Sequence, residues 1–249
     1  MDHSPELGPR LANYSTAHGK DKPVLDFAEA RSRMVDRQIA GRGVRDPNVL
    51  RAMGIVPREE FVADNVREYA YHDMPLSIGD GQTISQPYVV ALMTELARLQ
   101  PGDRVLDVGT GSGYAAAVLA EIVARVFSIE RLASLADVAR ERLALLGYDN
   151  IEVRTGDGTL GWPEEAPFDA IIAAAGGFEV PPALKEQLVD GGRLVMPVGS
   201  QVRAQHLVRL VRRSGDNFDE EDFGGVWFVP LIGAQGWSKD ERTGGRTKT

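Results

Sequence analysis

The sequence predicts an α/β protein in which helices cover both faces of a mostly parallel, seven-stranded, doubly wound sheet. The first observation is an apolar strand pattern at 104–108, which leads into closely spaced glycines and an Ala-rich helical stretch. The second is that two further predicted strands, 125–129 and 151–154, end in acidic or glycine-containing turns. The third is a series of later apolar runs at 168–173, 193–197, 206–211 and 225–229. In such a sheet the carboxyl ends of the strands border one crevice, where we expect a ligand.

Composition limits the classes of function. The chain has 249 residues, a formal net charge of −8 and no cysteine. The negative charge argues against a nucleic-acid phosphate backbone as the main partner, and the lack of cysteine excludes disulfides, thiol nucleophiles and thiolate metal sites. No apolar run approaches the roughly 18 residues that a bilayer span needs, and the polar N-terminus lacks a signal-peptide core. We therefore expect a cytoplasmic monomer with no metal, nucleic acid or membrane.

The chain is expected to divide into an arm, one domain and a tail. Residues 1–25 are polar and contain several Pro and Gly, which predicts a flexible arm, and the charged residues 238–249 predict a disordered tail. The single domain is expected to span 26–237. Within it, 26–85 would form a helical cap and a substrate loop, and 86–237 the sheet core.

Two helical segments predict the cap. Apolar residues at helical spacing follow Asp26, and the glycines up to Gly43 end this helix. Asp46 and Pro47 are typical of an N-cap and a first helical residue, which predicts a second short helix.

Two predictions concern the C-terminal part. The acidic segment 216–222 is expected to be a solvated turn before the seventh strand. Trp227, Phe228 and Trp237 are expected to pack in the core, and 231–237 are candidates to cover a substrate.

The turn after the first core strand has the features of a ligand-binding loop. Gly109, Gly111 and Gly113 occupy every second position, and Asp107 precedes the first of them by two residues. This G-x-G-x-G spacing differs from the G-x-G-x-x-G of dinucleotide-binding folds. A glycine turn allows backbone N–H groups to approach a ligand at a helix N-terminus. Helix caps and tight turns also use glycine, so the turn alone leaves ligand binding open.

Two further acidic turns favour a nucleoside ligand. Glu130 closes the second strand about 20 residues past the first glycine, where a carboxylate can accept hydrogen bonds from both hydroxyls of a ribose. Asp157 lies between two glycines after the third strand. Each acid alone could be a loop residue or a cap, but the three together indicate one nucleoside site.

This run resembles the S-adenosylmethionine site of class I methyltransferases, whose sheet is Rossmann-like. The resemblance implies that the cofactor is held by Asp107, Gly109, Thr110, Gly111, Gly113, Glu130, Asp157 and Gly158. Asp107 and the glycines would hold the methionine part, Glu130 the ribose, and Asp157 with Gly158 the adenine side.

The segment before the predicted helix at 86–98 carries small polar side chains on an apparent loop, among them Gln82, Thr83 and Ser85. Ser85 stands where an N-cap belongs, and Pro87 follows in the first turn. An N-cap role is compatible with a role in catalysis, because a helix N-terminus attracts an anion.

The octapeptide Gly81-Gln82-Thr83-Ile84-Ser85-Gln86-Pro87-Tyr88, placed before the glycine turn, resembles the protein-L-isoaspartate O-methyltransferase family, whose Thr-Ile-Ser-x-Pro signature it contains. The similarity extends over about residues 30–237. It implies methyl transfer from S-adenosylmethionine, which becomes S-adenosylhomocysteine, to the α-carboxylate of L-isoaspartyl residues in damaged proteins and peptides.

The family resemblance also assigns roles around this loop. Ser85 would be a hydrogen-bond donor that orients the acceptor carboxylate, Thr83 would act beside it, and Gln82 would contact the cofactor. Ile84, Ala174 and Ala175 would line the substrate site. The chain departs from the family at Gly176-Gly177-Phe178, where further small residues and a proline are usual, which leaves the shape of the substrate groove open.

Four alternatives remain at this point. A methyltransferase for another substrate, such as one biosynthetic peptide, would share the same motifs. A dinucleotide oxidoreductase is disfavoured by the glycine spacing, and a serine hydrolase would need a G-x-S-x-G elbow, which Ser85 lacks. The fourth is a protein that binds the cofactor and senses damaged proteins without methylating them.

Overall fold

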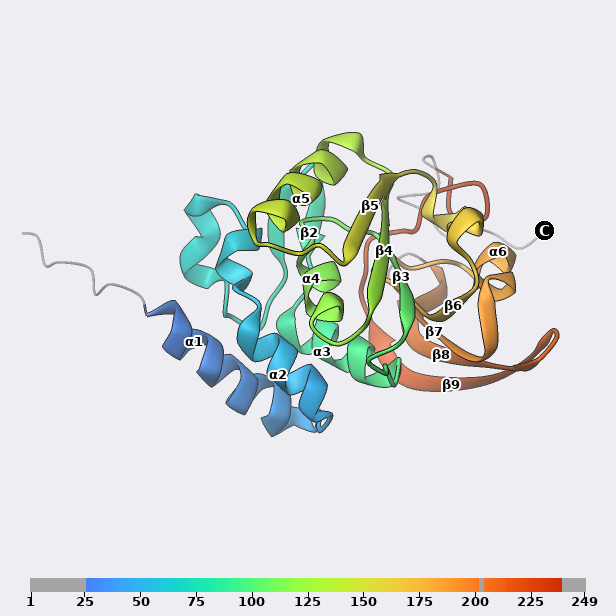
Figure 1. Ribbon diagram of the computed structural model, residues 1–249, viewed down its shortest axis with the longest axis horizontal. Coiled ribbons are helices and arrows are strands. Elements are labelled where there is room, and N and C mark those ends of the chain that lie inside the picture. Colours follow the sequence, from blue (N-terminus) through green and yellow to red (C-terminus); the bar gives the residue numbers. More distant parts are fainter. Residues whose placement is uncertain (1–25, 202–203, 239–249) are drawn as a thin grey trace, which may run out of the picture.

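The computed structural model describes residues 26–201 and 204–238, and one seven-stranded sheet dominates it (Figure 1). The strand order is β5-β4-β3-β6-β7-β8-β9. The strands are β3 Arg104–Val108, β4 Arg125–Glu130, β5 Ile151–Thr155, β6 Phe168–Ala173, β7 Leu188–Gln201, β8 Ala204–Ser214 and β9 Asn217–Val226. β3 to β7 pair in parallel, and β8 and β9 are added antiparallel. The predicted mostly parallel sheet is confirmed. The predictions for 1–25 and 239–249 fall outside the described residues.

The direction of winding reverses at β3. From β3 the chain moves outward to β4 and β5, and it then returns to the opposite side of β3 to build β6 and β7. The connections on the two sides of β3 therefore diverge at its carboxyl end. A doubly wound sheet opens a ligand crevice at this point.

Apolar side chains alternate across the central strands, so both faces of the sheet are buried. One set packs with the N-terminal helices and consists of Val105, Val126, Ala170 and Ile172. The other set packs on the opposite face and consists of Leu106, Phe127, Ile171 and Ala173. The longer connections form helices α3 Pro87–Leu96, α4 Tyr114–Ala120, α5 Ala133–Leu145 and α6 Pro182–Glu186. Strands that are apolar on both faces require cover on both sides, and these elements supply it.

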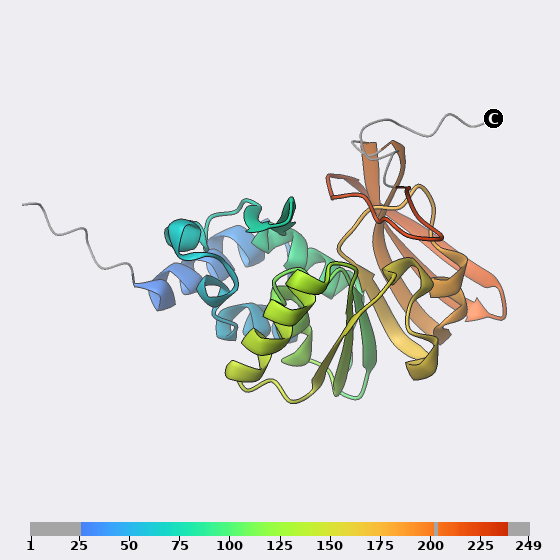
Figure 2. The same ribbon diagram turned by 90° about the horizontal axis from the view of Figure 1, so that it is seen from above.

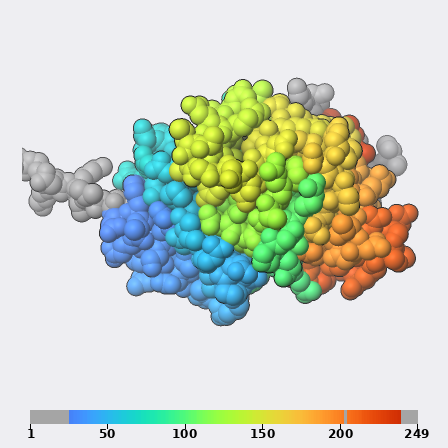
Figure 3. Space-filling model, in the orientation of Figure 1, coloured from blue at the N-terminus to red at the C-terminus, as the bar shows by residue number. Residues whose placement is uncertain are grey.

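The predicted N-terminal helices are present and form a cap. They are α1 Phe27–Arg33, the π-helical η1 Met34–Ile39, the 3-10 turn η2 Ala40–Arg42, α2 Pro47–Ile55, and the 3-10 turns η3 Arg58–Phe61 and η4 Asp64–Tyr69. Asp26 caps α1 and Asp46 caps α2, each through its carboxylate. Gly43, at φ +106°, ends the first helical run. Figure 2 shows this cap at the opposite end of the molecule from the C-terminal strands, and Figure 3 shows it packed against the segments that follow.

The acidic segment 216–222 does not form the predicted solvated turn. Most of it belongs to β9, which starts well before the strand predicted at 225–229. On the neighbouring strand, Arg209 lies opposite Glu221 in register and forms an ion pair with it at 2.6 Å. The prediction was wrong because charges on the adjacent strand stabilise these acids, and a local pattern cannot show such pairs.

The segment before α3 is a hairpin and not an open loop. β1 Leu76–Gly79 and β2 Gln82–Ile84 pair antiparallel, and the connection passes through Asp80 and Gly81, both at positive φ. The predicted loop residues therefore have a defined strand geometry.

The C-terminal aromatic residues divide into two kinds. Phe228 and Trp237 are buried, as predicted, but Trp227 is 74 % exposed. The two neighbours Trp227 and Phe228 follow the end of β9, and only the second is buried. Within 26–201 and 204–238, none of the helices combines the length and apolar character needed to cross a bilayer.

Candidate active site

A cavity at the carboxyl ends of β3, β4 and β6 brings most of the predicted site residues together. It is lined by Gln82, Thr83, Ile84, Ser85, Asp107, Gly109, Thr110, Gly111, Glu130, Gly158, Ala174 and Ala175. Two predicted residues, Gly113 and Asp157, do not line it. The walls come from β2, the glycine turn, the ends of three core strands, and a C-terminal segment at 229–232.

The glycine turn requires glycine for its backbone conformation. Gly109 and Gly111 have φ of +98° and +53°, and Gly113 precedes α4 with φ +94°. These values lie where a side chain strains the backbone. Gly158, on the opposite wall, is needed for space, because an added Cβ would lie 2.6 Å from Cγ1 of Val108. The glycines allow the backbone to approach whatever occupies the cavity.

Asp107 is a buried carboxylate in which one oxygen accepts a hydrogen bond and the other does not. Its Oδ2 accepts a hydrogen bond of 2.6 Å from Ser128, which lies opposite it in the parallel register of β3 and β4. Its Oδ1 is buried and has no hydrogen-bond partner within the described chain. Burial raises the pKa of Asp107 to about 6, the Ser128 hydrogen bond opposes this rise, and the charge of Glu130 adds to it. An unpartnered carboxylate oxygen facing a cavity is suited to an ammonium group.

Glu130 closes β4 and holds the glycine turn. Its Oε2 accepts a hydrogen bond from the Gly111 N–H at 3.0 Å, and its Oε1 accepts one from the Leu132 N–H at 2.9 Å. Each carboxylate oxygen has a second lone pair, so the group can still accept hydrogen bonds from two ribose hydroxyls. Glu130 lines the cavity, and its contact with a ribose stays a prediction.

Asp157 anchors the C-terminal segment. Its Oδ1 accepts hydrogen bonds from the backbone N–H and the hydroxyl of Thr159, and its Oδ2 accepts one of 2.7 Å from the N–H of Ala234. Trp237, which is fully buried, donates its indole N–H to the Gly176 carbonyl at 3.0 Å. We call residues 229–237 the C-terminal strap, because these contacts fasten it beside the cavity. The adenine contact predicted for Asp157 stays a prediction, and Gly158 is the member of the pair that lines the cavity.

The hydroxyl-bearing wall, which we call the lip, consists of residues 82–85. Gln82, Thr83 and Ile84 lie on β2, and Ser85 joins this strand to α3. The Ser85 hydroxyl makes no hydrogen bond to the described chain, so it is available to a ligand. Ser85 is not the helix cap that its position suggested, because Gln86 is the N-cap residue of α3 and no side-chain hydrogen bond caps it there. The Asp73 carboxylate instead accepts from the Tyr88 N–H at 3.3 Å.

The end of β6 forms the floor of the cavity. Ala174 donates its N–H to the Val108 carbonyl at 2.8 Å, which holds the turn after β6 against β3. Gly176 then forms a parallel bridge with Pro230 of the strap. A Cβ on Gly176 would lie 2.3 Å from Nε2 of Gln205. The Gly-Gly departure from the family pattern therefore coincides with close packing between this turn, β8 and the strap.

Sequence reasoning missed several residues around the cavity. Tyr114 and Arg131 line it, and Arg58 holds the lip from behind. Arg58 lies in a Pro-Arg-Glu-Glu run that is typical of an exposed turn, and no local signal distinguishes it. No histidine lines the cavity in the described part of the chain, and no cluster of three potential metal ligands occurs there.

Asp107 of β3 and Glu130 at the end of β4 bring two acids to the cavity. Together with the strand order, this arrangement places the chain among the class I methyltransferases. A solved protein-L-isoaspartate O-methyltransferase superposes with a TM-score of 0.76 and 31 % identity, covering 83 % of this chain and 67 % of that one. A putative one from Plasmodium falciparum, in complex with S-adenosyl-L-homocysteine, gives a TM-score of 0.70 and 27 % identity, over 81 % of this chain and 98 % of the other.

The sequence comparisons are more specific. The family model for protein-L-isoaspartate(D-aspartate) O-methyltransferase matches residues 29–236. A Brucella anthropi protein-L-isoaspartate O-methyltransferase is 55 % identical over 214 residues, which are 86 % of this chain and 98 % of that protein. A Rhodopseudomonas palustris relative with the name protein-L-isoaspartate O-methyltransferase 1 is 58 % identical over 220 residues, 87 % and 90 % of the two chains. The chain belongs to the protein-L-isoaspartate O-methyltransferase family.

Proposed function

We propose that this protein transfers a methyl group from S-adenosylmethionine to the α-carboxylate of L-isoaspartyl residues in damaged proteins and peptides. The observation that carries the proposal is the pairing of two chemistries across one cavity. The lining of this cavity includes both the buried acids Asp107 and Glu130 and the hydroxyl-bearing lip at Thr83 and Ser85.

The cofactor side suits a cationic nucleoside. Asp107 would hold the ammonium of the methionine part through its free Oδ1, Glu130 would hold the ribose, and Gly158, which lines the cavity, would lie on the adenine side. Bound S-adenosylmethionine would supply a methyl group on a positively charged sulfur. The unpartnered buried oxygen of Asp107 is the structural feature that supports this assignment.

The acceptor side needs to position its substrate and does not need a base. A carboxylate is ionised at pH 7, since its reference pKa is about 3.3 to 3.9. Ser85 would donate a hydrogen bond to the acceptor carboxylate and orient one oxygen toward the cavity. Thr83 and the backbone N–H groups of the lip would complete this contact. Holding both partners in line can contribute several kcal/mol to the rate.

The lip and the strap would also exclude water. The attacking carboxylate and the sulfonium neutralise each other, so a site with little water favours the reaction. Val229 to Ile232 of the strap also line the cavity and would cover the bound peptide. We further propose that the enzyme works as a cytoplasmic monomer, with 26–237 as one catalytic domain and without nucleic acid or membrane.

The test is methyl incorporation from labelled S-adenosylmethionine into an isoaspartyl peptide beside its aspartyl twin. We expect base-labile label in the isoaspartyl peptide and at least a hundredfold less in the twin. Equal labelling of the two peptides would contradict the proposed acceptor. Labelling of neither peptide, with the cofactor bound, would favour a sensor or a dedicated peptide substrate.

A further inference from the structure

Arg58 is a fully buried cation behind the lip. It lies in η3, and its side chain crosses to two backbone carbonyls that are distant in the sequence. Nε donates to the Ala70 carbonyl at 2.7 Å, and Nη2 donates to the Ser85 carbonyl at 2.8 Å. Its guanidinium carbon lies 4.8 Å from the centre of the Tyr114 ring. One side chain thus joins the cap, the start of α4 and the lip.

The charge of Arg58 has no carboxylate in contact within the described residues. Its Nη1 is buried and has no hydrogen-bond partner there, and desolvation lowers its pKa from the usual value. Among the groups that oppose this fall in the pKa, the Tyr114 side chain has the largest effect; Asp73 contributes least, and its own ion pair is with Arg42. A buried charge without a contacting counterion is costly, and the two carbonyls and the Tyr114 ring that Arg58 contacts are all uncharged groups.

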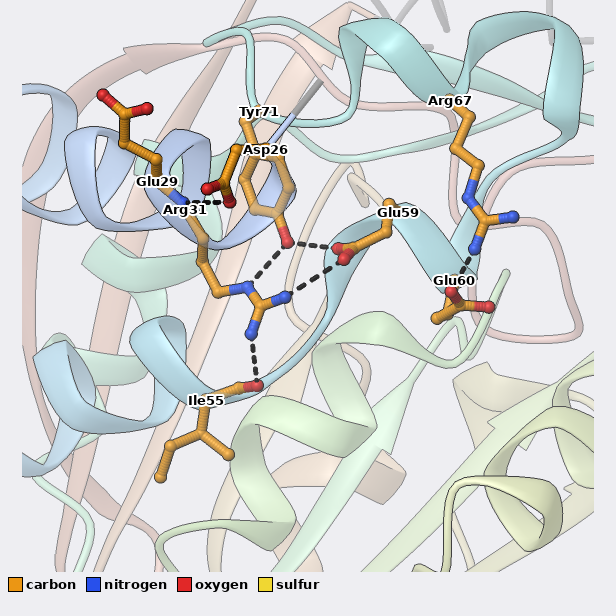
Figure 4. Close-up of polar contacts among 8 residues, drawn as sticks. All are labelled: Asp26, Glu29, Arg31, Ile55, Glu59, Glu60, Arg67 and Tyr71. Carbon is orange, nitrogen blue, oxygen red and sulfur yellow. Dashed lines mark hydrogen bonds and ion pairs between the residues drawn. The ribbon is translucent and has the colours of Figure 1, made fainter. Parts of the chain in front are cut away.

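Arg31 shows what a structural arginine looks like in the same cap. Its guanidinium donates to the Tyr71 hydroxyl at 2.7 Å, to Glu59 at 3.0 Å and to the Ile55 carbonyl at 3.0 Å (Figure 4). Every part of that guanidinium has a partner, and one partner is a carboxylate. Arg31 and Arg58 therefore differ in whether the chain itself neutralises them.

The position of Arg58 relates its charge to the acceptor site. Ser85 and Tyr114, the two residues that it contacts on this side, both line the cavity. The guanidinium thus lies directly behind that wall, separated from the cavity by a layer of protein. A charge acts over several ångströms more strongly through protein than through water, because the effective dielectric constant is lower.

We propose that Arg58 is a positioning residue of the acceptor site, which holds the Ser85 carbonyl and provides the positive charge that favours an acceptor with a carboxylate over a neutral one. This inference rests on the proposed function. The acceptor carboxylate becomes the counterion that the folded chain does not supply to Arg58.

The test compares two peptide ligands on enzyme saturated with S-adenosylhomocysteine, so that no turnover occurs. One peptide carries an isoaspartyl residue, and the other carries the same residue with its α-carboxylate converted to a carboxamide. Calorimetry gives the ratio of the two dissociation constants for the wild type, Arg58→Met, Arg58→Lys and the control Arg31→Met. We expect the preference for the carboxylate to fall at least fivefold in Arg58→Met and to stay within twofold in Arg58→Lys and Arg31→Met.

Two further measurements separate positioning from loss of structure. Arg58→Met should raise the KM for the isoaspartyl peptide at least tenfold and change the cofactor dissociation constant less than twofold, whereas Arg31→Met should lower the Tm and leave this KM within twofold. Ser85→Ala removes the hydroxyl but keeps the carbonyl that Arg58 holds, so in that background Arg58→Met should have a smaller effect on kcat/KM and should still lower the preference for the carboxylate peptide at least threefold. Arg58→Gln, which keeps an N–H donor, serves the same comparison if the methionine variant does not fold.

An unchanged carboxylate preference in both neutral variants would overturn the inference, and so would an equal loss in Arg31→Met. Failure of the proposed function looks different. In that case the wild type itself would not methylate the isoaspartyl peptide, whatever residue stands at position 58.

Discussion

Asp107 and Ser128 lie opposite each other on β3 and β4, and the Ser128 hydroxyl donates a 2.6 Å hydrogen bond to one oxygen of the Asp107 carboxylate. The other oxygen is buried at the cavity without a partner in the described chain. Desolvation of this kind raises the pKa of Asp107 to about 6. The charge of the group therefore depends on pH within a range in which the enzyme can be studied.

Cofactor binding should depend on this titration. Below pH 6 Asp107 gains a proton and loses its negative charge, so it attracts a cation less. We expect the dissociation constant of S-adenosylmethionine to rise about tenfold between pH 7 and pH 5, following the change in Asp107 charge. Asp107→Asn should bind weakly at both pH values and show little of this dependence. Calorimetry at the two pH values measures it, and a wild-type affinity that does not change would contradict the assignment.

Ser85→Ala should lower turnover and leave the dissociation constant of the cofactor nearly unchanged. In the proposed function the hydroxyl would donate to the acceptor carboxylate, and a hydrogen bond to a charged group contributes about 1.5 to 3 kcal/mol. We therefore expect kcat/KM for the isoaspartyl peptide to fall roughly ten- to hundredfold. Steady-state kinetics measures kcat/KM for the variant and the wild type, and calorimetry measures their affinities for the cofactor. Full activity in the variant would remove Ser85 from the mechanism.

Glu130→Ala should weaken cofactor binding directly. The substitution removes the acceptor for the Gly111 N–H and the group assigned to the ribose. We expect the dissociation constant of S-adenosylhomocysteine to rise at least tenfold, as the loss of charged hydrogen bonds predicts. Glu130→Gln, which keeps the shape and one acceptor oxygen, should lose less. If the alanine variant binds S-adenosylhomocysteine as tightly as the wild type does, the ribose assignment is wrong.

Asp157→Ala should release the C-terminal strap. The N–H groups of Thr159 and Ala234 would lose their acceptor, at a cost of about 1 to 3 kcal/mol for each group that stays buried. We expect a lower Tm and faster amide hydrogen exchange in 231–237. Asp219→Ala, on the exposed β9, is the control and should change neither by much. Unchanged exchange in the strap would show that Asp157 is not its anchor.

The central sheet could be predicted because each strand carries its own apolar pattern and its own end signal. Val105 and Leu106 had to be buried on opposite faces of any sheet that contained them. Glu130 could be placed at the cavity because its distance from Gly109 follows from a strand, a turn and a helix of ordinary length. The hairpin of β1 and β2 was missed, and the start of β9 was placed too late, because both pairings depend on residues in a neighbouring strand.

Arg58 and Asp157 also differ between what their local sequence indicates and what the folded structure makes of them. The sequence marks Arg58 as a charged turn residue, and only the packed structure buries it behind Ser85. It marks Asp157 as a strand-end acid, and the strap that reaches this acid from residue 234 uses its carboxylate. Local spacing cannot show which distant backbone groups need an acceptor.

The sequence by itself determined the order of the core strands along the chain, the glycine turn and the composition of the lip, since these depend on residues close together in the chain. Only the tertiary structure decided which carboxylate oxygens stay free, which cation lies behind the lip and which contacts fasten the C-terminal strap beside the cavity. Hydrogen bonds and burial between distant segments set those properties, and their energies exist only once the chain has folded.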